Sequence, residues 1–197
     1  MVLDERAWSV AQSALWGPAD YATVFRAVWD DAGLFVRFDA TDPDPWSIWT
    51  HRDDKLWNEE VVEIFVQPSG QSEYGEVEIS PANVVCDVWV DPGPRRFDAA
   101  WTLDGLETRV AIAKDERGRT TGWSAVAFMP WNGFARARGA RLPPASAERW
   151  RFNVFRIERP GGKEHPEEGA LFLAWSPTGV RSFHVPDAFR ELVFVDR

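Results

Sequence analysis

Short segments in which apolar and polar residues alternate recur along this 197-residue chain, and turn-forming residues separate them. Alternation with a period of two is typical of a β-strand that packs one face on a core. Many short strands at this spacing favour a sandwich or a barrel. The segments expected to form strands are 22–29, 34–40, 61–67, 75–80, 84–90, 107–113, 123–129, 149–158, 171–175 and 192–195.

The residues between these segments agree with strand ends and tight turns. A hairpin turn is expected at 30–33 (DDAG), and a strand is expected to end at 91–94 (DPGP). Residues 41–58 are expected to be irregular, and a short helix is expected over 131–137. Since no repeat or linker divides the chain, we predict one domain over residues 1–197. Its expected fold is an all-β, two-sheet antiparallel sandwich, jelly-roll-like in arrangement and immunoglobulin-like in size.

The alternation also assigns side chains to the two faces of each strand. In the segments 61–67 and 75–80, the apolar residues are expected on the core face, with Glu63 and Glu78 on the opposite one. The same rule places Trp89 opposite the apolar residues of the next strand. These three side chains are therefore expected on one sheet surface, which is either ordinary solvated surface or a recognition face.

Charge and composition narrow the classes of partner. The chain has 31 acidic and 22 basic residues, for a formal net charge of −9, and no basic cluster interrupts the acidic surface. Because such a surface repels phosphate groups, nucleic acids and anionic membranes are poor partners. No apolar window is long enough to span a membrane, and residues 1–11 do not predict a signal peptide. Cys86 has no second cysteine with which to form an intrachain disulfide.

Tryptophan is unusually frequent, with 12 Trp against 2 Tyr. An indole ring fills a hydrophobic core well, and it also offers a flat face on which the C–H groups of a pyranose can stack. The excess of tryptophan is consistent with both uses.

Five groups of residues resemble, in the same order, motifs of family 9 carbohydrate-binding modules and the wider family-9-like, or DOMON-like, sandwich domains. The similarity extends from about residue 22 to residue 194. The matching groups are Leu56–Val66 (LWNEEVVEIFV), Tyr74–Pro81 (YGEVEISP), Gly122–Trp131, Arg151–Arg156 (RFNVFR) and Ala174–Pro177 (AWSP).

The resemblance implies a non-catalytic module that binds the reducing end of a mono- or oligosaccharide between two tryptophan rings. It assigns these rings to Trp57 and Trp175, and a hydrogen-bonding carboxylate to Glu63. Further polar contacts are expected from Glu78, Ser80, Asn153 and Arg156. Ser80 stands where the family often has Asn, and Glu78 where sugar-binding members carry a basic residue. The resemblance also favours a role in carbohydrate catabolism and a secreted or periplasmic location, although a cytoplasmic one stays open.

No cofactor is expected to be required, but structural calcium is a further implication of the resemblance. Four aspartates precede Trp57, and calcium prefers clustered carboxylate and carbonyl oxygens. The candidate ligands are Asp42, Asp44, Asp53 and Asp54. The alternative is that these residues only form turns.

Three other functions remain open at this stage. The chain could be a structural or protein-interaction domain without affinity for sugars. Glu63 and Glu78, on neighbouring strands, could be the paired carboxylates of a glycosidase. Haem-binding domains share this type of sandwich, so Met129 could pair with His165 or His184 as an axial ligand. The sequence does not specify the sugar or the oligomeric state.

Overall fold

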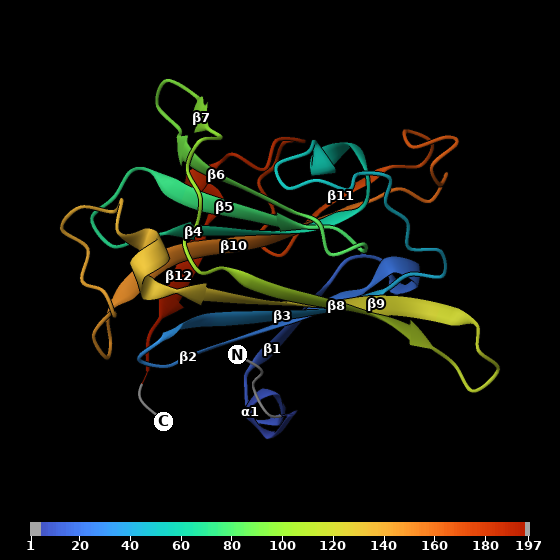
Figure 1. Ribbon diagram of the computed structural model, residues 1–197, viewed down its shortest axis with the longest axis horizontal. Helices are drawn as coiled ribbons and strands as arrows, with labels where there is room; N and C mark the ends of the chain where they lie inside the picture. Colours follow the sequence, from blue (N-terminus) through green and yellow to red (C-terminus); the bar gives the residue numbers. More distant parts are fainter. Residues whose placement is uncertain (1–4, 196–197) are drawn as a thin grey trace.

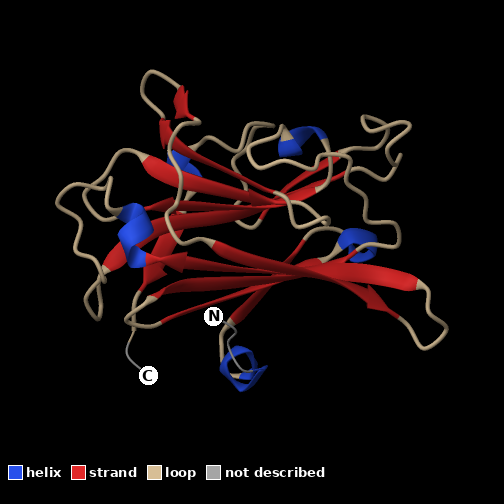
Figure 2. Ribbon diagram, in the orientation of Figure 1, coloured by secondary structure: helices blue, strands red, loops and turns tan. Residues whose placement is uncertain are grey.

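The computed structural model describes residues 5–195, which form two antiparallel β-sheets packed face to face (Figures 1 and 2). The predicted two-sheet sandwich is confirmed. The five-stranded sheet has the spatial order β1 (Ser13–Trp16), β2 (Thr23–Trp29), β3 (Gly33–Thr41), β9 (Thr120–Pro130) and β8 (Glu107–Lys114). The seven-stranded sheet has the order β11 (Leu171–Ala174), β10 (Arg149–Glu158), β4 (Val61–Gln67), β5 (Tyr74–Ile79), β6 (Val85–Asp91) and β7 (Arg96–Asp98), and β12 (Arg190–Val193) pairs with β10 next to β11.

Helices are few and short. The α-helix α1 and the 3-10 helices η1 to η4 span Glu5–Ser9, Ala19–Tyr21, Leu56–Asn58, Trp131–Phe134 and Pro186–Ala188. The helix expected over 131–137 is therefore one 3-10 turn that ends at Phe134. Within residues 5–195, no helix has the length and apolar character needed to cross a bilayer.

The observed strands match the expected segments to within a few residues at each end. The sequence pattern missed β1 and β7, which have four and three residues. A segment of three or four residues displays a period of two only weakly, so pairing with a neighbouring strand is what identifies β1 and β7. The alternation found all the longer strands and two of the four-residue ones, β11 and β12.

Large apolar side chains from both sheets fill the space between them. Phe38 and Trp123 of the five-stranded sheet meet Ile64 and Phe152 of the seven-stranded sheet in one buried cluster. Trp150 extends this cluster through edge-on ring contacts with its aromatic neighbours. Each buried aromatic ring removes about 150–250 Å² from water, so this inter-sheet core is the main source of stability.

A second apolar layer covers the outer face of the seven-stranded sheet, which the sequence pattern predicted to be an exposed surface. Phe65 and Phe155 point into this layer, and Phe183 and Phe189, from the segment after β11, pack onto them. Every residue of β4 and β5 is consequently buried. The prediction of an exposed face was wrong because a loop from a distant part of the chain covers it.

The two-sided burial also reverses the orientation predicted for β6. Trp89 lies in the inter-sheet core with 1% of its surface exposed, whereas Cys86 and Val88 face the outer layer. Trp89 lies opposite Gly75, where a Cβ atom would stand 3.5 Å from the indole ring. Alternation gives the period of a strand but cannot identify the inner face when both faces are covered.

The position of Trp89 makes a clear prediction about stability. We expect Trp89→Ala to lower the free energy of unfolding by about 3–5 kcal/mol, because it leaves a cavity in the inter-sheet core. Ile112 of β8, which is 43% exposed, provides the control, and Ile112→Ala should cost no more than about 0.5 kcal/mol. Urea denaturation measures both, and equal small effects would contradict the burial of Trp89.

Candidate functional site

Trp57 is the one exposed tryptophan of the twelve, all of which lie within residues 5–195. Its exposed fraction is 44%, although the preceding residue, Leu56, is fully buried. The 3-10 turn η2 accounts for this difference in exposure. It directs the Leu56 side chain into the outer apolar layer and leaves the Trp57 ring at the surface. Trp57 is therefore the tryptophan whose flat apolar face is most accessible from solvent.

The backbone around Trp57 is held firmly. The Trp57 carbonyl accepts a hydrogen bond of 2.8 Å from Arg159, which is itself buried. Arg159 also donates to the carbonyl of Glu59 at 3.2 Å. Since η2 lies next to β5, these bonds hold the backbone of the turn at the outer face of the seven-stranded sheet, where Leu56 is buried.

Three glutamates lie together on that outer face, and we call Glu63, Glu76 and Glu78 the outer acidic cluster. Glu63 of β4 is the register partner of Glu78 of β5, and Glu76 follows on the same face. They are only 3%, 4% and 3% exposed, in the order given. The predicted proximity of Glu63 and Glu78 is therefore confirmed, but both lie beneath the outer layer and not on an open surface.

Burial dominates the acid–base properties of this cluster. Removal from water, followed by repulsion from Glu78, raises the pKa of Glu63 well above its ordinary value. The same two causes raise the pKa of Glu76, and burial raises the pKa of Glu78 to about 8. Burial therefore disfavours the ionised form of all three carboxyl groups.

His184 and Tyr74 close one side of the cluster. The Tyr74 hydroxyl and the His184 Nδ1 are hydrogen-bonded at 2.8 Å, and the same nitrogen lies 3.8 Å from Glu76. Burial, followed by repulsion from Arg95, lowers the pKa of His184 to about 4, so the imidazole is neutral at pH 7. Sequence reasoning missed His184 as a neighbour of the carboxylates because it is more than a hundred residues away in the chain.

Ser80 and Asn153 have structural contacts. Ser80 accepts a hydrogen bond from the backbone of Val84 and contacts the Ser47 hydroxyl at 3.3 Å, which places it beside the outer acidic cluster. Asn153 bonds both backbone groups of Ser176, at 2.9 and 3.0 Å, and so fixes the segment after β11 to β10. The predicted role of Asn153 in sugar contact conflicts with this use of both ends of its amide.

Trp175 does not form a slot with Trp57. Its backbone is bonded to Val154, and its ring packs edge-on against Phe25 at 5.0 Å, facing the inter-sheet core. The backbone of Trp57 is hydrogen-bonded to Arg159, which follows the end of β10 and is five residues beyond Val154, roughly 16 Å along an extended chain. The ring pair that the resemblance implied is therefore not assembled, because the Trp175 ring packs toward the inter-sheet core. With Trp29 and other apolar residues it lines a cleft of about 590 Å³ near β12.

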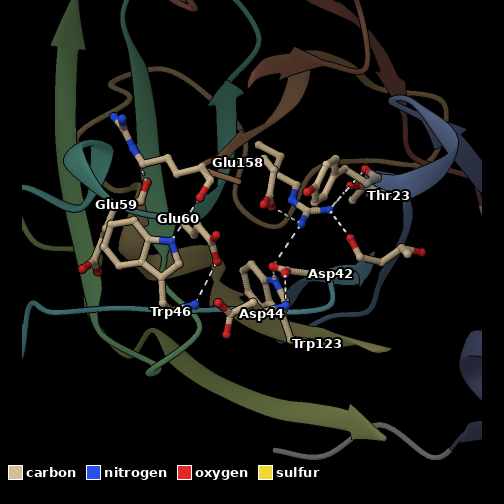
Figure 3. A network of polar contacts seen from close by, with 12 residues as sticks. Thr23, Asp42, Asp44, Trp46, Glu59, Glu60, Trp123 and Glu158 are labelled. Atoms are coloured by element: carbon tan, nitrogen blue, oxygen red, sulfur yellow. Dashed lines mark hydrogen bonds and ion pairs between the residues drawn. The ribbon is translucent and has the colours of Figure 1, made fainter. Parts of the chain in front are cut away.

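Arg156 also lies away from the outer face, fully buried among polar groups of both sheets. Figure 3 shows Thr23, Asp42 and Glu158 of this network. The guanidinium of Arg156 contacts Asp42 at 3.2 Å and also Glu158. Its other terminal nitrogen donates to Thr23 and to the carbonyls of Tyr21 and Thr41. The prediction that Arg156 contacts sugar was wrong, since a strand turns alternate residues to opposite faces and Arg156 follows Phe155.

We call Asp42, Glu60, Glu158 and Arg156 the inner polar network. Burial raises the pKa of Glu60 to about 10, and Glu158 and Asp42 add to this effect. Burial also raises the pKa of Glu158 to about 7, although Arg156 opposes the shift. Sequence reasoning missed Glu60 and Glu158, and the only available signal was the presence of acidic residues at the ends of strongly apolar strands.

The predicted calcium ligands do not gather at one point. Asp42 lies in the inner polar network and accepts the backbone N–H of Asp44 at 2.9 Å. Asp53 and Asp54 bond instead to the backbone of Asp87 and of residues 50–51. In the described part of the chain, the carboxylates whose oxygens lie within 4.8 Å of one another are Asp42, Glu60 and Glu158.

This donor set does not fit calcium. Calcium needs six to eight oxygen ligands, whereas the guanidinium of Arg156 already occupies the oxygens of Asp42, Glu158 and three neighbouring groups. The charge of Arg156 therefore takes the place that a bound cation would fill. We assign no role to a metal in this network.

The network predicts the effect of removing its cation. We expect Arg156→Met to destabilise the fold by about 3–5 kcal/mol, because it leaves buried carboxyl groups without their counter-charge. Arg156→Lys should recover part of the loss. Thermal unfolding with and without chelator is the check, and a lower melting temperature of the unaltered protein in chelator would contradict the assignment of Arg156 as the neutralising group.

The raised carboxyl pKa values predict how stability depends on pH. In the unfolded chain these carboxyls ionise near pH 4.3, but in the folded chain Glu158 and Glu78 retain protons up to about pH 7 and 8. The folded state then binds more protons, so stability is greatest at acidic pH and falls as the pH rises from about 4.5 to 8. We expect Glu78→Gln to weaken this decline, while Glu116→Gln, at an exposed turn, should follow the unaltered protein in denaturation across this pH range.

Comparison with known proteins identifies the family to which this chain belongs. A family model described as carbohydrate-binding family 9 matches residues 1–194. An extracellular protein of Arthroderma benhamiae is 26% identical over 187 residues, which cover 88% of this chain and 78% of that protein.

Solved structures show the same sandwich. A Bacteroides uniformis protein, to which carbohydrate binding has been provisionally assigned, has a TM-score of 0.76 and 16% identity, with 95% of this chain and 88% of that one covered. A family 9 module of Caldicellulosiruptor kristjanssonii in complex with glucose has a TM-score of 0.67 and 16% identity, covering 100% and 90%. Its complex with cellotriose gives 0.66 and 15%, covering 97% and 86%.

Proposed function

This chain belongs to carbohydrate-binding family 9, and from that premise we propose that it binds a saccharide without catalysing its conversion. The observation that carries the proposal is Trp57, the one exposed tryptophan of the twelve, on the turn η2 that lies next to β5. An exposed indole supplies the flat apolar contact, and Glu63 and Glu78 supply hydrogen-bonding groups for hydroxyls. Trp57 and these carboxyl groups form the proposed sugar site.

The strength expected from one ring is modest. Covering about 100 Å² of indole face at ~25 cal/mol per Å² contributes about 2.5 kcal/mol, before hydrogen bonds are added. Charge-neutral hydrogen bonds to hydroxyls add about 0.5–1.5 kcal/mol each. Dissociation constants between millimolar and micromolar are therefore expected.

The protonation of the outer acidic cluster supports binding over catalysis. A glycosidase needs one carboxylic acid and one ionised carboxylate beside the scissile bond. Glu63, Glu76 and Glu78 all have raised pKa values with burial as the main cause, so none is distinguished as the ionised partner.

The relatives suggest the type of sugar and the location. The Caldicellulosiruptor kristjanssonii module was solved with glucose and with cellotriose, which supports a hexopyranose as the bound unit. We propose further that its reducing end enters the site, as the family resemblance implies. The Arthroderma benhamiae relative is described as extracellular, which supports a secreted or periplasmic location. A role in carbohydrate catabolism would follow from such a location.

Substitution of Trp57 tests the proposal. We expect Trp57→Ala to weaken binding of glucose or cellobiose about tenfold or more, since it removes the stacking surface, while Trp57→Phe retains part of it. The matched control is Ile112→Ala, which removes an equally exposed apolar side chain from the other sheet. Isothermal titration gives the affinities, and circular dichroism confirms that each variant is folded.

Capping the anomeric oxygen tests the reducing-end orientation. Methyl glucoside should bind more weakly than glucose if the anomeric hydroxyl enters the site. Equal affinities of the two sugars would exclude this orientation, and unchanged binding in Trp57→Ala would exclude Trp57 as the platform. If no saccharide binds at all, the alternative of a protein-interaction domain gains support.

A further inference from the structure

The two sheets leave a cleft between their edges at β12. On one edge of β10, β12 pairs with residues 149–152 and β11 with residues 155–158, so that Asn153 and Val154 separate the two partner strands. β1 and β2 form the edge of the five-stranded sheet on the other side of the cleft. The volume of about 590 Å³ falls within the roughly 300–1,000 Å³ of small-molecule sites.

Side chains directed at the inter-sheet core stay partly exposed along this cleft. Ala14 of β1 and Ala27 of β2 pack against the core but are only half-buried, and the same holds for Trp29, Trp175 and Leu192. The small side chains of Ala14 and Ala27 leave this part of the inter-sheet space unfilled. Apolar surface left in contact with water in a concave place is typical of a binding site.

Four aromatic rings line the cleft. Phe25 and Trp29 belong to β2, Phe152 belongs to β10, and Trp175 follows β11. The Trp175 ring meets Phe25 edge-on with 5.0 Å between ring centres, and it meets Phe152 edge-on at 6.4 Å. Because aromatic rings attract one another through such edge-to-face contacts, a flat aromatic ring suits the shape and the charge distribution of these walls.

The walls are held in place without a ligand. The indole N–H of Trp29 donates to the carbonyl of Val195 at 3.1 Å, and the ring packs edge-on against Phe194 at 5.3 Å. The backbone N–H of Trp175 donates to the carbonyl of Val154 at 3.0 Å. A ligand therefore enters a cleft that is already formed, so little free energy is lost to ordering of the protein.

The polarity of the lining favours a neutral ligand with few hydrogen-bonding groups. Glu191 is the one charged side chain among the residues that line the cleft, and it forms an ion pair with Arg149. Apart from the indole N–H groups, Gln12 and Ser13 provide the other polar side chains of the lining. An anion would find no cation among these residues, and a sugar would find few side-chain partners for its hydroxyl groups.

We propose that this cleft binds a neutral, flat aromatic compound of one or two rings, which contacts Phe25, Trp29 and Trp175. The cleft lies between the sheets, whereas Trp57 lies on the turn next to β5 at the outer face of the seven-stranded sheet. The inference therefore goes beyond the proposed carbohydrate binding and does not rest on it. It gives Trp175 a ligand other than the sugar that the family resemblance implied.

Three ligands with a common two-ring skeleton test the class of compound by isothermal titration at neutral pH. 2-Naphthol is flat and neutral, decahydro-2-naphthol is saturated and not flat, and 2-naphthoate carries a negative charge. We expect 2-naphthol to bind about threefold or more tighter than decahydro-2-naphthol, because only the aromatic rings make edge-to-face contacts. It should bind about tenfold or more tighter than 2-naphthoate, whose carboxylate would lose its hydration without gaining a partner.

Filling the cleft tests the location. We expect Ala27→Phe to weaken binding of 2-naphthol about tenfold or more, because the added ring takes up the space of the ligand. The matched control is Ala111→Phe, at an exposed position of β8 on the opposite edge of the same sheet, which should leave the affinity unchanged. In NMR spectra of the unaltered protein, 2-naphthol should shift the indole N–H signals of Trp29 and Trp175 but not that of Trp57.

The contrary outcomes overturn the proposal in distinct ways. Equal affinities of 2-naphthol and decahydro-2-naphthol would exclude an aromatic ligand class, and tighter binding of 2-naphthoate would exclude a neutral one. Displacement of 2-naphthol by glucose would assign the cleft to the sugar. If 2-naphthol does not bind and the protein sediments as a dimer that Ala27→Phe dissociates, a second copy of the chain covers the cleft.

The test is also independent of the folding of one variant and of the sugar site. Should Ala27→Phe fail to fold, the NMR shifts in the unaltered protein still decide where 2-naphthol binds. Trp57→Ala should bind 2-naphthol as the unaltered protein does, whether or not it binds glucose. Failure of carbohydrate binding and failure of the aromatic site are therefore distinguishable.

Discussion

The burial of both faces of the seven-stranded sheet is the constraint from which the other features follow. β4, β5 and β10 have the inter-sheet core on one side and a second apolar layer on the other. A polar side chain on these strands cannot reach bulk water, whichever way it points. Each one must find its partner inside the protein or in a ligand.

The inner polar network and the outer acidic cluster satisfy this constraint in different ways. On the inner side, the inner polar network includes its own cation, Arg156, and ties the two sheets together through Thr23 and Asp42. On the outer side, the carboxyls of the outer acidic cluster lie beneath the apolar layer, and burial raises their pKa values. The inner network thus offsets the cost of burial with an ion pair, whereas the outer cluster does so by favouring the neutral form of its carboxyls.

Trp57 differs from the other tryptophans because its ring is exposed. A single 3-10 turn buries Leu56 in the outer layer and leaves Trp57 in water, and Arg159 fixes its backbone. The other tryptophans mostly strengthen the core, as the edge-on contacts of Trp150 and the packing of Trp175 illustrate. Tryptophan abundance in this chain is therefore mainly a matter of packing, with the ring of Trp57 left exposed.

The sequence alone determined the strands, the two-sheet architecture and the family, because a period of two and ordered local motifs are properties of neighbouring residues. It also predicted that Glu63 and Glu78 would be close, since a short turn links their strands. It could not determine that Trp89 and Arg156 face inward, that Trp175 lies far from Trp57, or that His184 covers Glu76. Those outcomes depend on which face of a strand is covered by segments distant in the chain, and only tertiary packing decides that.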